Sequence, residues 1–249
     1  MTLPIPILRR PAWTLMAAWT TALGACSSTG PTDGCATPLP GDACLDMSRA
    51  GGLAAHQELI TEEVSAAFAT IRPLIDVDGV RIAIIADASR VIPEVGLGGF
   101  NPGTHEVRIF GDPGRPDLET VLRSELAPQL AHELHHAARR RAVGYGSTLR
   151  EASVTEGLAD HFSLEVTDRE PPPWTSALSP EEMDVWLPEV VAGADGPYDH
   201  SKWFFGTDTI PYWTGYAVGF EIVRRYLTEH PEALPSGLVG TPAADLVGG

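Results

Sequence analysis

Two histidines four residues apart, with a glutamate directly after the first, constrain this chain more than any other feature. They stand near its middle in the run Ala-His-Glu-Leu-His-His, as His132, Glu133 and His136. In a helix, residues four apart lie on one face, about 40° apart around the axis, so both imidazoles reach one point. Zinc prefers such neutral nitrogens, and a neighbouring carboxylate can accept a proton from zinc-bound water. The spacing therefore predicts a helix that carries a metal site, and the alternative is a solvated helix face.

A catalytic zinc site needs a third protein ligand and a fourth position left open for water. Glu156, in the run Thr-Glu-Gly-Leu-Ala-Asp, follows twenty residues after His136. That gap holds the end of one helix, two glycines, and a capping box of Thr148 and Glu151 that opens a second helix. Two antiparallel helices joined in this way bring Glu156 level with the histidine pair. We therefore predict that Glu156 is the third ligand.

Neighbouring residues on the same two helices receive other interpretations. Asp160 lies one turn beyond Glu156, where it can accept the other ring N–H of a ligand histidine and fix its tautomer. Glu151 and His161 compete as third ligands, although the capping box explains Glu151, and His161 lies about 100° around the helix from Asp160. His135 is interpreted as a neighbour of the ligands or a surface residue.

Periodicity places these motifs in an α+β chain that is mostly helical and has a small β-sheet. The glycine-rich segment 95–105 lacks a phosphate-loop pattern and is interpreted as a loop. Pro128 is expected to kink or restart the helix that carries the histidines. Apolar stripes predict helices over 53–71 and 214–229, and capping residues predict helices over 118–141 and 148–166. A β-branched run and an alternating run predict strands over 80–87 and 105–110.

Together these motifs resemble a known family. The histidine motif followed by Glu-x-x-x-Asp on a second helix resembles the gluzincin metallopeptidases. More narrowly, four runs look like a bacterial family of predicted zinc-dependent proteases, catalogued as a domain of unknown function: LAHELHHAARR, VTEGLADHFS, PPPWTSAL and WFFG…PYWTGYAVGF. The resemblance covers about residues 60–230. It implies a zincin-like fold, one Zn²⁺ ion and a hydrolase activity, but no particular substrate.

The predicted reaction is hydrolysis of a peptide bond by zinc-activated water, with Glu133 as general base. The tetrahedral oxyanion needs a further donor, and His200 and Tyr216 are the candidates by residue type. A loop histidine and a core tyrosine are the competing interpretations of these two residues. The strand over 105–110 is expected to be a sheet edge that pairs with an extended substrate, as in zincins generally.

Two other functions stay open at this point. One is a non-catalytic, lipid-anchored envelope protein that binds a partner or acts like a chaperone, with a structural zinc. The aromatic segment 174–213 would be its partner surface, although aromatic residues more often form core under loops. Glu133 argues against this function, because a structural zinc site has no use for a carboxylate there. The other alternative keeps the zinc chemistry and acts as an amidase on cell-wall peptides.

The N-terminal residues predict export and a lipid anchor. Arg9 and Arg10 precede an apolar stretch, 12–25, that has the length of a signal-peptide core and is too short to span a bilayer. It ends in Leu-Gly-Ala-Cys, which resembles a bacterial lipobox. Residues 1–25 are therefore predicted to be a lipoprotein signal peptide, with Cys26 lipidated. No Asp follows Cys26, which points to the outer membrane, facing the periplasm or the exterior; the alternative is a secreted protein with a plain thiol.

The cysteine count supports the lipid anchor. The chain has three cysteines, an odd number that leaves one over in an exported protein. If Cys26 carries lipid, Cys35 and Cys44 remain free to form a disulfide in an oxidising compartment. Residues 26–49 are rich in Ser, Thr, Gly and Pro and are interpreted as a tether. Residues 50–249 would then form the metallopeptidase domain.

The charge balance excludes one class of partner. The chain has 17 Lys and Arg against 33 Asp and Glu, a net charge of −16. Such an acidic protein does not bind nucleic acid through its phosphates, and it gains nothing from an anionic lipid surface. We expect a monomer that acts on peptide or protein substrates and whose only membrane anchor is the lipid.

Overall fold

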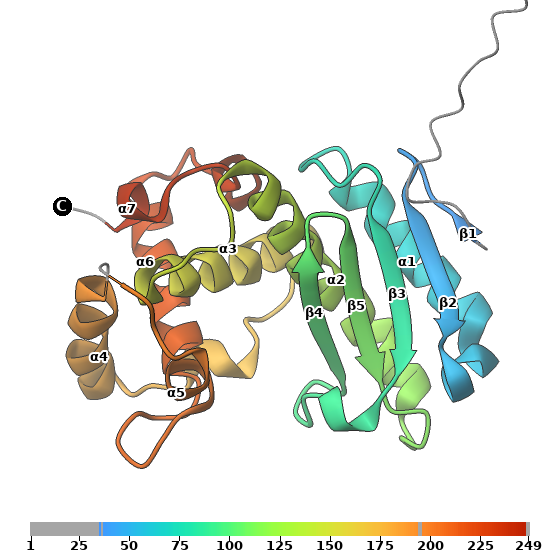
Figure 1. The fold of residues 1–249 in the computed structure, drawn as a ribbon, viewed down its shortest axis with the longest axis horizontal. Helices are drawn as coiled ribbons and strands as arrows, with labels where there is room; N and C mark the ends of the chain where they lie inside the picture. The colour runs from blue at the N-terminus through green and yellow to red at the C-terminus, as the bar shows by residue number, and fades with distance from the viewer. Residues whose placement is uncertain (1–34, 36, 194–195, 248–249) are drawn as a thin grey trace, which may run out of the picture.

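A five-stranded sheet and a group of helices lie side by side in the computed structural model (Figure 1). The structure describes residue 35 and residues 37–193 and 196–247. The strand order is β1-β2-β3-β5-β4, in which β2, β3 and β5 are parallel and the two edge strands are antiparallel to their neighbours. The strands are β1 (Thr37–Pro38), β2 (Cys44–Arg49), β3 (Arg81–Ala86), β4 (Leu97–Gly103) and β5 (Glu106–Gly111).

The helices confirm the expected α+β class with a mostly helical chain. The four predicted helices correspond to α1, α2, α3 and α6. Short 3₁₀ turns occur at Gly51–His56, Ala88–Arg90, Pro173–Ser176 and Pro235–Leu238. The α-helices are α1 (Gln57–Ile71), α2 (Leu118–Ala142), α3 (Leu149–Thr167), α4 (Pro180–Ala192), α5 (His200–Phe205), α6 (Thr214–Glu229) and α7 (Ala243–Leu246).

Pro128 does not restart the helix that contains it, because α2 runs unbroken through this position. A proline has no N–H, so the carbonyl of Ser124, four residues earlier, loses its helical partner. The Arg169 guanidinium donates to that carbonyl instead. On the other side, the Pro128 carbonyl accepts a hydrogen bond from the Ser163 hydroxyl at 3.0 Å. Side chains from α3 and the loop after it therefore support α2 at this position.

Two predictions about the sheet are wrong. The glycine-rich segment interpreted as a loop forms β4, and the strand at 105–110 is not an edge, because β5 lies between β3 and β4. Glycine is depleted in strands, which hid β4 from the pattern. The structure needs glycine there: a Cβ at Gly98 would lie less than 3.0 Å from the Arg90 carbonyl. The exposed edge of the sheet next to α2 is therefore β4.

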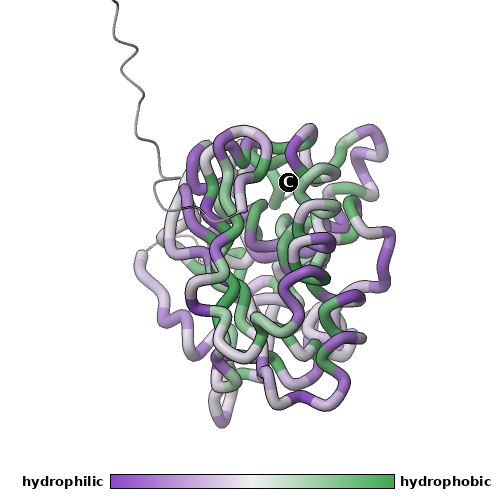
Figure 2. Tube along the Cα trace, turned by 90° about the vertical axis from the view of Figure 1, so that its right-hand side faces the viewer, coloured by the Kyte–Doolittle hydropathy of each residue, from purple (hydrophilic) through white to green (hydrophobic). Residues whose placement is uncertain are grey.

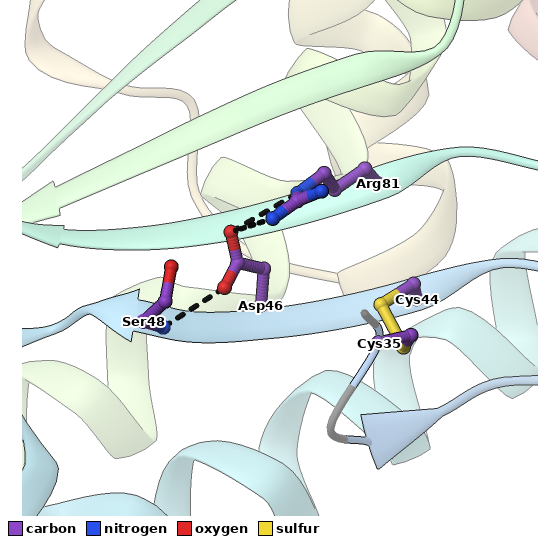
Figure 3. The surroundings of a disulfide bond; sticks show 5 residues. All are labelled: Cys35, Cys44, Asp46, Ser48 and Arg81. Atoms are coloured by element: carbon purple, nitrogen blue, oxygen red, sulfur yellow. Dashed lines mark hydrogen bonds and ion pairs between the residues drawn. A yellow bond between two sulfur atoms is a disulfide. The ribbon is translucent and has the colours of Figure 1, made fainter. Parts of the chain in front are cut away.

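The predicted tether ends earlier than residue 49. Residues Cys44–Arg49 form β2 and pair in parallel with β3, so they belong to the sheet. A disulfide joins Cys44 to Cys35, with Cα atoms 5.8 Å apart, and the Asp46 carboxylate accepts two hydrogen bonds from Arg81 on β3 (Figure 3). The apolar part of β2 is short and has polar neighbours in the sequence, so the sequence pattern did not indicate a strand. Pairing with the buried strand β3 stabilises it in the fold.

The core has two parts. Helices α1 and α2 cover one face of the sheet, and their apolar residues join those of the strands, such as Val107 and Ile109, in an aliphatic cluster. A second cluster lies among α3, α4, α5 and α6 and contains many aromatic residues at its margin. Hydrophilic residues follow the outer turns of the chain, and hydrophobic ones are more frequent towards its middle (Figure 2).

None of the helices in the described residues is long and apolar enough to cross a bilayer. The predicted signal peptide, residues 1–25, and the predicted lipidation residue, Cys26, lie outside the described residues. Their roles stay predictions.

Candidate metal centre

Helices α2 and α3 pack against each other and bring three predicted ligands to one point. The two Nε2 atoms of His132 and His136 lie 3.0 Å apart. Oε2 of Glu156 lies 3.1 Å from the first of these nitrogens and 3.3 Å from the second. All three side chains are buried, and within the described residues they form a group that can hold a metal ion. The twenty-residue gap and the capping box thus bring Glu156 level with the histidines.

The chemistry of these donors fits zinc. Bonds of about 2.0–2.1 Å in a tetrahedral site separate neighbouring ligand atoms by roughly 3.3 Å, close to the spacing found here. Nδ1 of His132 lies 2.9 Å from Asp160 Oδ1 and donates to it, so in a neutral ring Nε2 carries a lone pair. That lone pair faces the Glu156 carboxylate, another acceptor. Two buried acceptors that face each other require a positive charge between them, either a metal ion or a proton.

The electrostatics of the buried group agree with this requirement. Burial lowers the pKa of His132, but the carboxylates of Asp160 and Glu156 raise it well above its ordinary value. Burial opposes ionisation of Glu156, but the two histidines hold the pKa of this carboxyl well below its usual range. The site therefore favours a positive charge beside an ionised Glu156.

Two residues that sequence reasoning missed hold the ligands in place. The Trp174 indole donates to Asp160 Oδ2 at 2.8 Å, which fixes the carboxylate that orients His132. The Tyr145 hydroxyl, from the turn between α2 and α3, donates to Glu156 Oε1, the oxygen that points away from the histidines. Tyr145 stands between two glycines in the turn that joins the ligand helices, and this position was the signal available in the sequence.

Glu133 lies beside the ligands without joining them. It is buried, its Oε1 accepts a hydrogen bond from Gln129 at 3.2 Å, and its Oε2 has no partner among the described residues. Burial raises its pKa above the ordinary value. A Cβ at Gly99 of β4 would lie less than 3.0 Å from this carboxylate, so the glycine makes room for it. One oxygen is thus held in place, while the other is buried without a hydrogen-bond partner among the described residues.

The competing ligands lie elsewhere. Glu151 accepts hydrogen bonds from the backbone and hydroxyl of Thr148 at 3.0 and 3.1 Å and completes the predicted capping box. His161 donates through Nε2 to the Phe220 carbonyl at 3.0 Å and stacks on that ring, which ties α3 to α6. His135 is not a surface residue: it is fully buried against Phe162, and burial lowers its pKa well below the ordinary value.

The ligands open onto a cleft of about 710 Å³. Its walls come from β4 and the segment before it, from α2 and α3, and from the aromatic C-terminal part of the chain. His200 and Tyr216 both line it, where His200 stacks on Phe204 with ring centroids 4.2 Å apart and burial raises the pKa of Tyr216 well above the ordinary value. Among the described residues, neither is hydrogen-bonded to a ligand.

The four tryptophans of segment 174–213 divide between the two expected roles. Trp174 and Trp213 line the cleft, whereas Trp186 and Trp203 pack edge to face within the second core cluster. Trp213 has a positive φ of 68°, a conformation that is rare for a bulky residue. This segment therefore contributes both to the wall of the cleft and to the hydrophobic core.

Comparison with known proteins places this arrangement in a family. Residues 60–247 match the family described as "Predicted Zn-dependent protease (DUF2268)". The chain belongs to this family. The match begins in α1, ends after α7, and includes all three ligands together with Glu133 and Asp160. The resemblance to a family of predicted zinc-dependent proteases is thereby confirmed.

A curated protein is also similar to this chain. It is the "Uncharacterized protein YjaZ" of Bacillus subtilis (strain 168), with 30% identity over 117 residues. The aligned part is 44% of this chain and 45% of that protein. The chain thus aligns with less than half the length of this relative. Activity and substrate therefore have to be argued from the site.

Proposed function

We propose that this protein is a zinc-dependent metallopeptidase. The observation that carries the proposal is the buried triangle of His132, His136 and Glu156, with the carboxylate of Glu133 beside it at the floor of a large cleft. A structural zinc site closes its fourth position with a protein ligand, whereas a catalytic site leaves it open. Here the three ligand residues line a cleft together with Glu133, a carboxylate that is not needed as a ligand.

The residues of the site divide the work of peptide hydrolysis. Zinc held by the three ligands would supply a Lewis acid that polarises water and the scissile carbonyl. Glu133 takes the proton of the attacking water through its free oxygen and later delivers it to the leaving amine. Gln129 orients Glu133, while Asp160 and Trp174 orient His132.

An extended substrate would lie along β4. This strand is the sheet edge next to α2, and its residues line the cleft together with the ligands. Edge strands bind extended peptides through backbone hydrogen bonds. His200 and Tyr216 line the same cleft and remain our candidates for a donor to the oxyanion.

A single-residue change tests the proposal. Glu133→Gln keeps all three ligands, so we expect zinc content and folding to be nearly unchanged while the hydrolysis of peptides falls by about 10²–10⁴. Metal content is measured by elemental analysis, and activity with a pool of quenched fluorescent peptides that includes cell-wall peptides. Glu119→Gln, an exposed carboxylate on the same helix, is the matched control. Full activity of Glu133→Gln would show that Glu133 is not the general base and refute the proposed mechanism. Zinc-loaded wild-type protein that cleaves no peptide would make the zinc structural and refute the proposed function.

The anchor belongs to the proposal as a separate part. We expect the mature chain to begin at Cys26, to carry acyl groups there, and to be a monomer held in the outer membrane by that lipid. Mass spectrometry of membrane-extracted protein would show the acylated N-terminus. An unmodified N-terminus elsewhere would refute the anchor and leave the peptidase proposal intact.

A further inference from the structure

One arginine of the cleft has no acidic partner. Most arginines in the described part of the chain lie within 4.0 Å of a carboxylate, but Arg140 does not. Arg139 and Arg150 also lack one, but neither lines the cleft, and Arg139 is buried and donates to Thr155 and to the carbonyls of Val239 and Thr241. Arg140 instead lines the cleft, one helical turn after the ligand His136.

Its guanidinium is held in a fixed position. Nε donates to Asn101 Oδ1 at 2.5 Å and Nη2 donates to the Asn101 carbonyl at 3.3 Å. Asn101 is buried in β4, and its own amide donates to the carbonyls of Gly103 and Glu106, which fixes its orientation. The guanidinium carbon also lies 4.7 Å from the centre of the Tyr145 ring. Nη1 has no hydrogen-bond partner within the described residues and is available to a ligand.

The charges around the cleft leave this cation unbalanced. The carboxylates that line it are Glu133 and Glu156, and both belong to the metal centre. Arg90, the other cation of the cleft wall, has Asp87 at 3.6 Å. In a chain with a net charge of −16, an arginine left unpaired inside the cleft is the exception. A planar guanidinium with free N–H groups is suited to a carboxylate.

The position of Arg140 sets where that carboxylate would lie. Four residues along a helix advance about 6 Å, so the guanidinium lies about one turn beyond His136. An extended peptide advances about 3.3 Å per residue, so the same distance corresponds to about two residues of a substrate that lies along β4. Arg140, which is hydrogen-bonded to Asn101 of β4, is thus next to the path of the substrate.

We propose that Arg140 binds a carboxylate of the substrate within about two residues of the scissile bond, and that this protein selects anionic peptides. This inference rests on the proposed peptidase function. The carboxylate comes from an acidic side chain or from the C-terminus of a peptide, which share the same chemistry. The aromatic side chains that line the rest of the cleft, among them Phe100, Phe205 and Tyr212, would contact the apolar parts of such a substrate.

Paired peptides test the inference on the zinc-loaded full chain. One pair differs by Glu against Gln near the cleaved bond, and a second pair differs by a free or amidated C-terminus, which separates the two sources of carboxylate. We expect kcat/KM to be about tenfold higher for the anionic member of one pair, since hydrogen bonds to charged groups have about this effect. Arg140→Gln should reduce that ratio to near one, Arg140→Lys should keep part of it, and Arg140→Glu should favour Lys over Glu.

The ratio separates selection from a merely structural role. If Arg140 only supports Asn101 and Tyr145, its loss slows both members of a pair equally and the ratio stays unchanged. Arg141→Gln is the matched control, because Arg141 donates to Thr104 and Asp76 away from the cleft. A wild-type ratio near one, or a ratio that Arg140→Gln does not change, would overturn the inference.

Failure of the proposed function would look different. In that case no peptide is cleaved, yet the inference is still tested by equilibrium binding. Dissociation constants for the same peptide pairs are measured on the Glu133→Gln protein through the fluorescence of the cleft tryptophans. Equal binding of both members overturns the inference, and preferential binding of the anionic member, lost in the Glu133→Gln Arg140→Gln protein, supports it.

Discussion

The sheet half of the molecule (β1–β5 with α1 and α2) and the helical half (α3–α7) are held together by different means. In the sheet half, aliphatic side chains fill the space between the strands and the two helices, and a disulfide joins Cys35 to Cys44. In the helical half, aromatic rings surround a smaller core, and α3 and α6 approach so closely that Gly157 and Gly219 leave no room for a Cβ.

The metal centre lies across the junction of these halves. α2 supplies both histidines and Glu133, whereas α3 supplies Glu156 and Asp160. A bound ion would therefore fasten the helical half to the sheet half, in addition to its part in the chemistry. The sheet half is held together by apolar packing, whereas the α2–α3 contact combines such packing with buried charges that a cation would balance.

Removal of zinc should have the largest effect, and it should fall on the helical half. A ligand present at a thousand times its dissociation constant adds about 4 kcal/mol to the free energy of unfolding. Chelation should therefore lower the melting temperature and release the backbone amides of α3 and α6 to hydrogen exchange before those of β3 and β5. Glu156→Gln should behave like the chelated protein and not respond to chelator. Equal loss of protection in both halves would contradict the division.

The substitution Gly219→Ala should have the next largest effect on stability. A Cβ at this position would lie less than 3.0 Å from the Ser153 carbonyl on α3, and backbone cannot yield as a side chain can. Overpacking of this kind costs about 3 kcal/mol. Gly103→Ala in the sheet half is the control, because a Cβ there meets no atom within 4 Å, and we expect less than about 1 kcal/mol. Denaturant unfolding measures the free energy of unfolding of both variants. Similar losses in the two variants would contradict the tight contact between α3 and α6.

The sequence predicted the parts of both halves that follow a regular pattern. The 3.6-residue stripes located α1 and α6, and the caps and end signals located α2 and α3. Helix geometry predicted that His132 and His136 meet, and the length of the turn and capping box between the two helices predicted that Glu156 joins them. The buried strand β3 was found from its β-branched residues.

The remaining features depend on contacts between distant segments, which a local pattern does not record. β4 was missed because its glycines are there for the Arg90 carbonyl and the Glu133 carboxylate. Tyr145, Trp174 and Arg140 could not be assigned, because a tyrosine in a turn or an arginine near a helix end has many uses until its partners are known.

Loss of the disulfide should lower the free energy of unfolding by less than Gly219→Ala does, and it should affect the sheet half alone. The two cysteines are nine residues apart, and closing a loop of this size in the unfolded chain corresponds to about 2–3 kcal/mol. Cys35→Ser with Cys44→Ser should lower the denaturant midpoint, while zinc content and peptide hydrolysis stay unchanged. β2 is separated from β4 by β3 and β5, which is the reason to expect no effect on the cleft. Reduced zinc affinity in this variant would show that the halves are coupled more tightly than their packing indicates.

The smallest effect concerns the ion pair of Asp46 and Arg81 in the sheet half, whose contribution to stability depends on pH. Burial opposes ionisation of Asp46, but hydrogen bonds from Ser48 and Arg81 lower the pKa of its carboxyl below the ordinary value of 3.8. The folded state thus binds this proton more weakly than the unfolded state, so the stabilisation is present above about pH 4 and is lost as the pH falls through the folded pKa.

Because the Arg81 side chain is 38% exposed, we expect Asp46→Asn to lower the free energy of unfolding by only about 1 kcal/mol at pH 7. The difference between wild type and variant should shrink as the pH falls below about 3.8, a trend that urea unfolding at several pH values can follow. A difference that stays constant down to pH 2 would mean that the carboxylate charge contributes nothing. The result also bears on the division of the molecule, since a change confined to β2 and β3 should leave hydrogen exchange in α3 and α6 as it was.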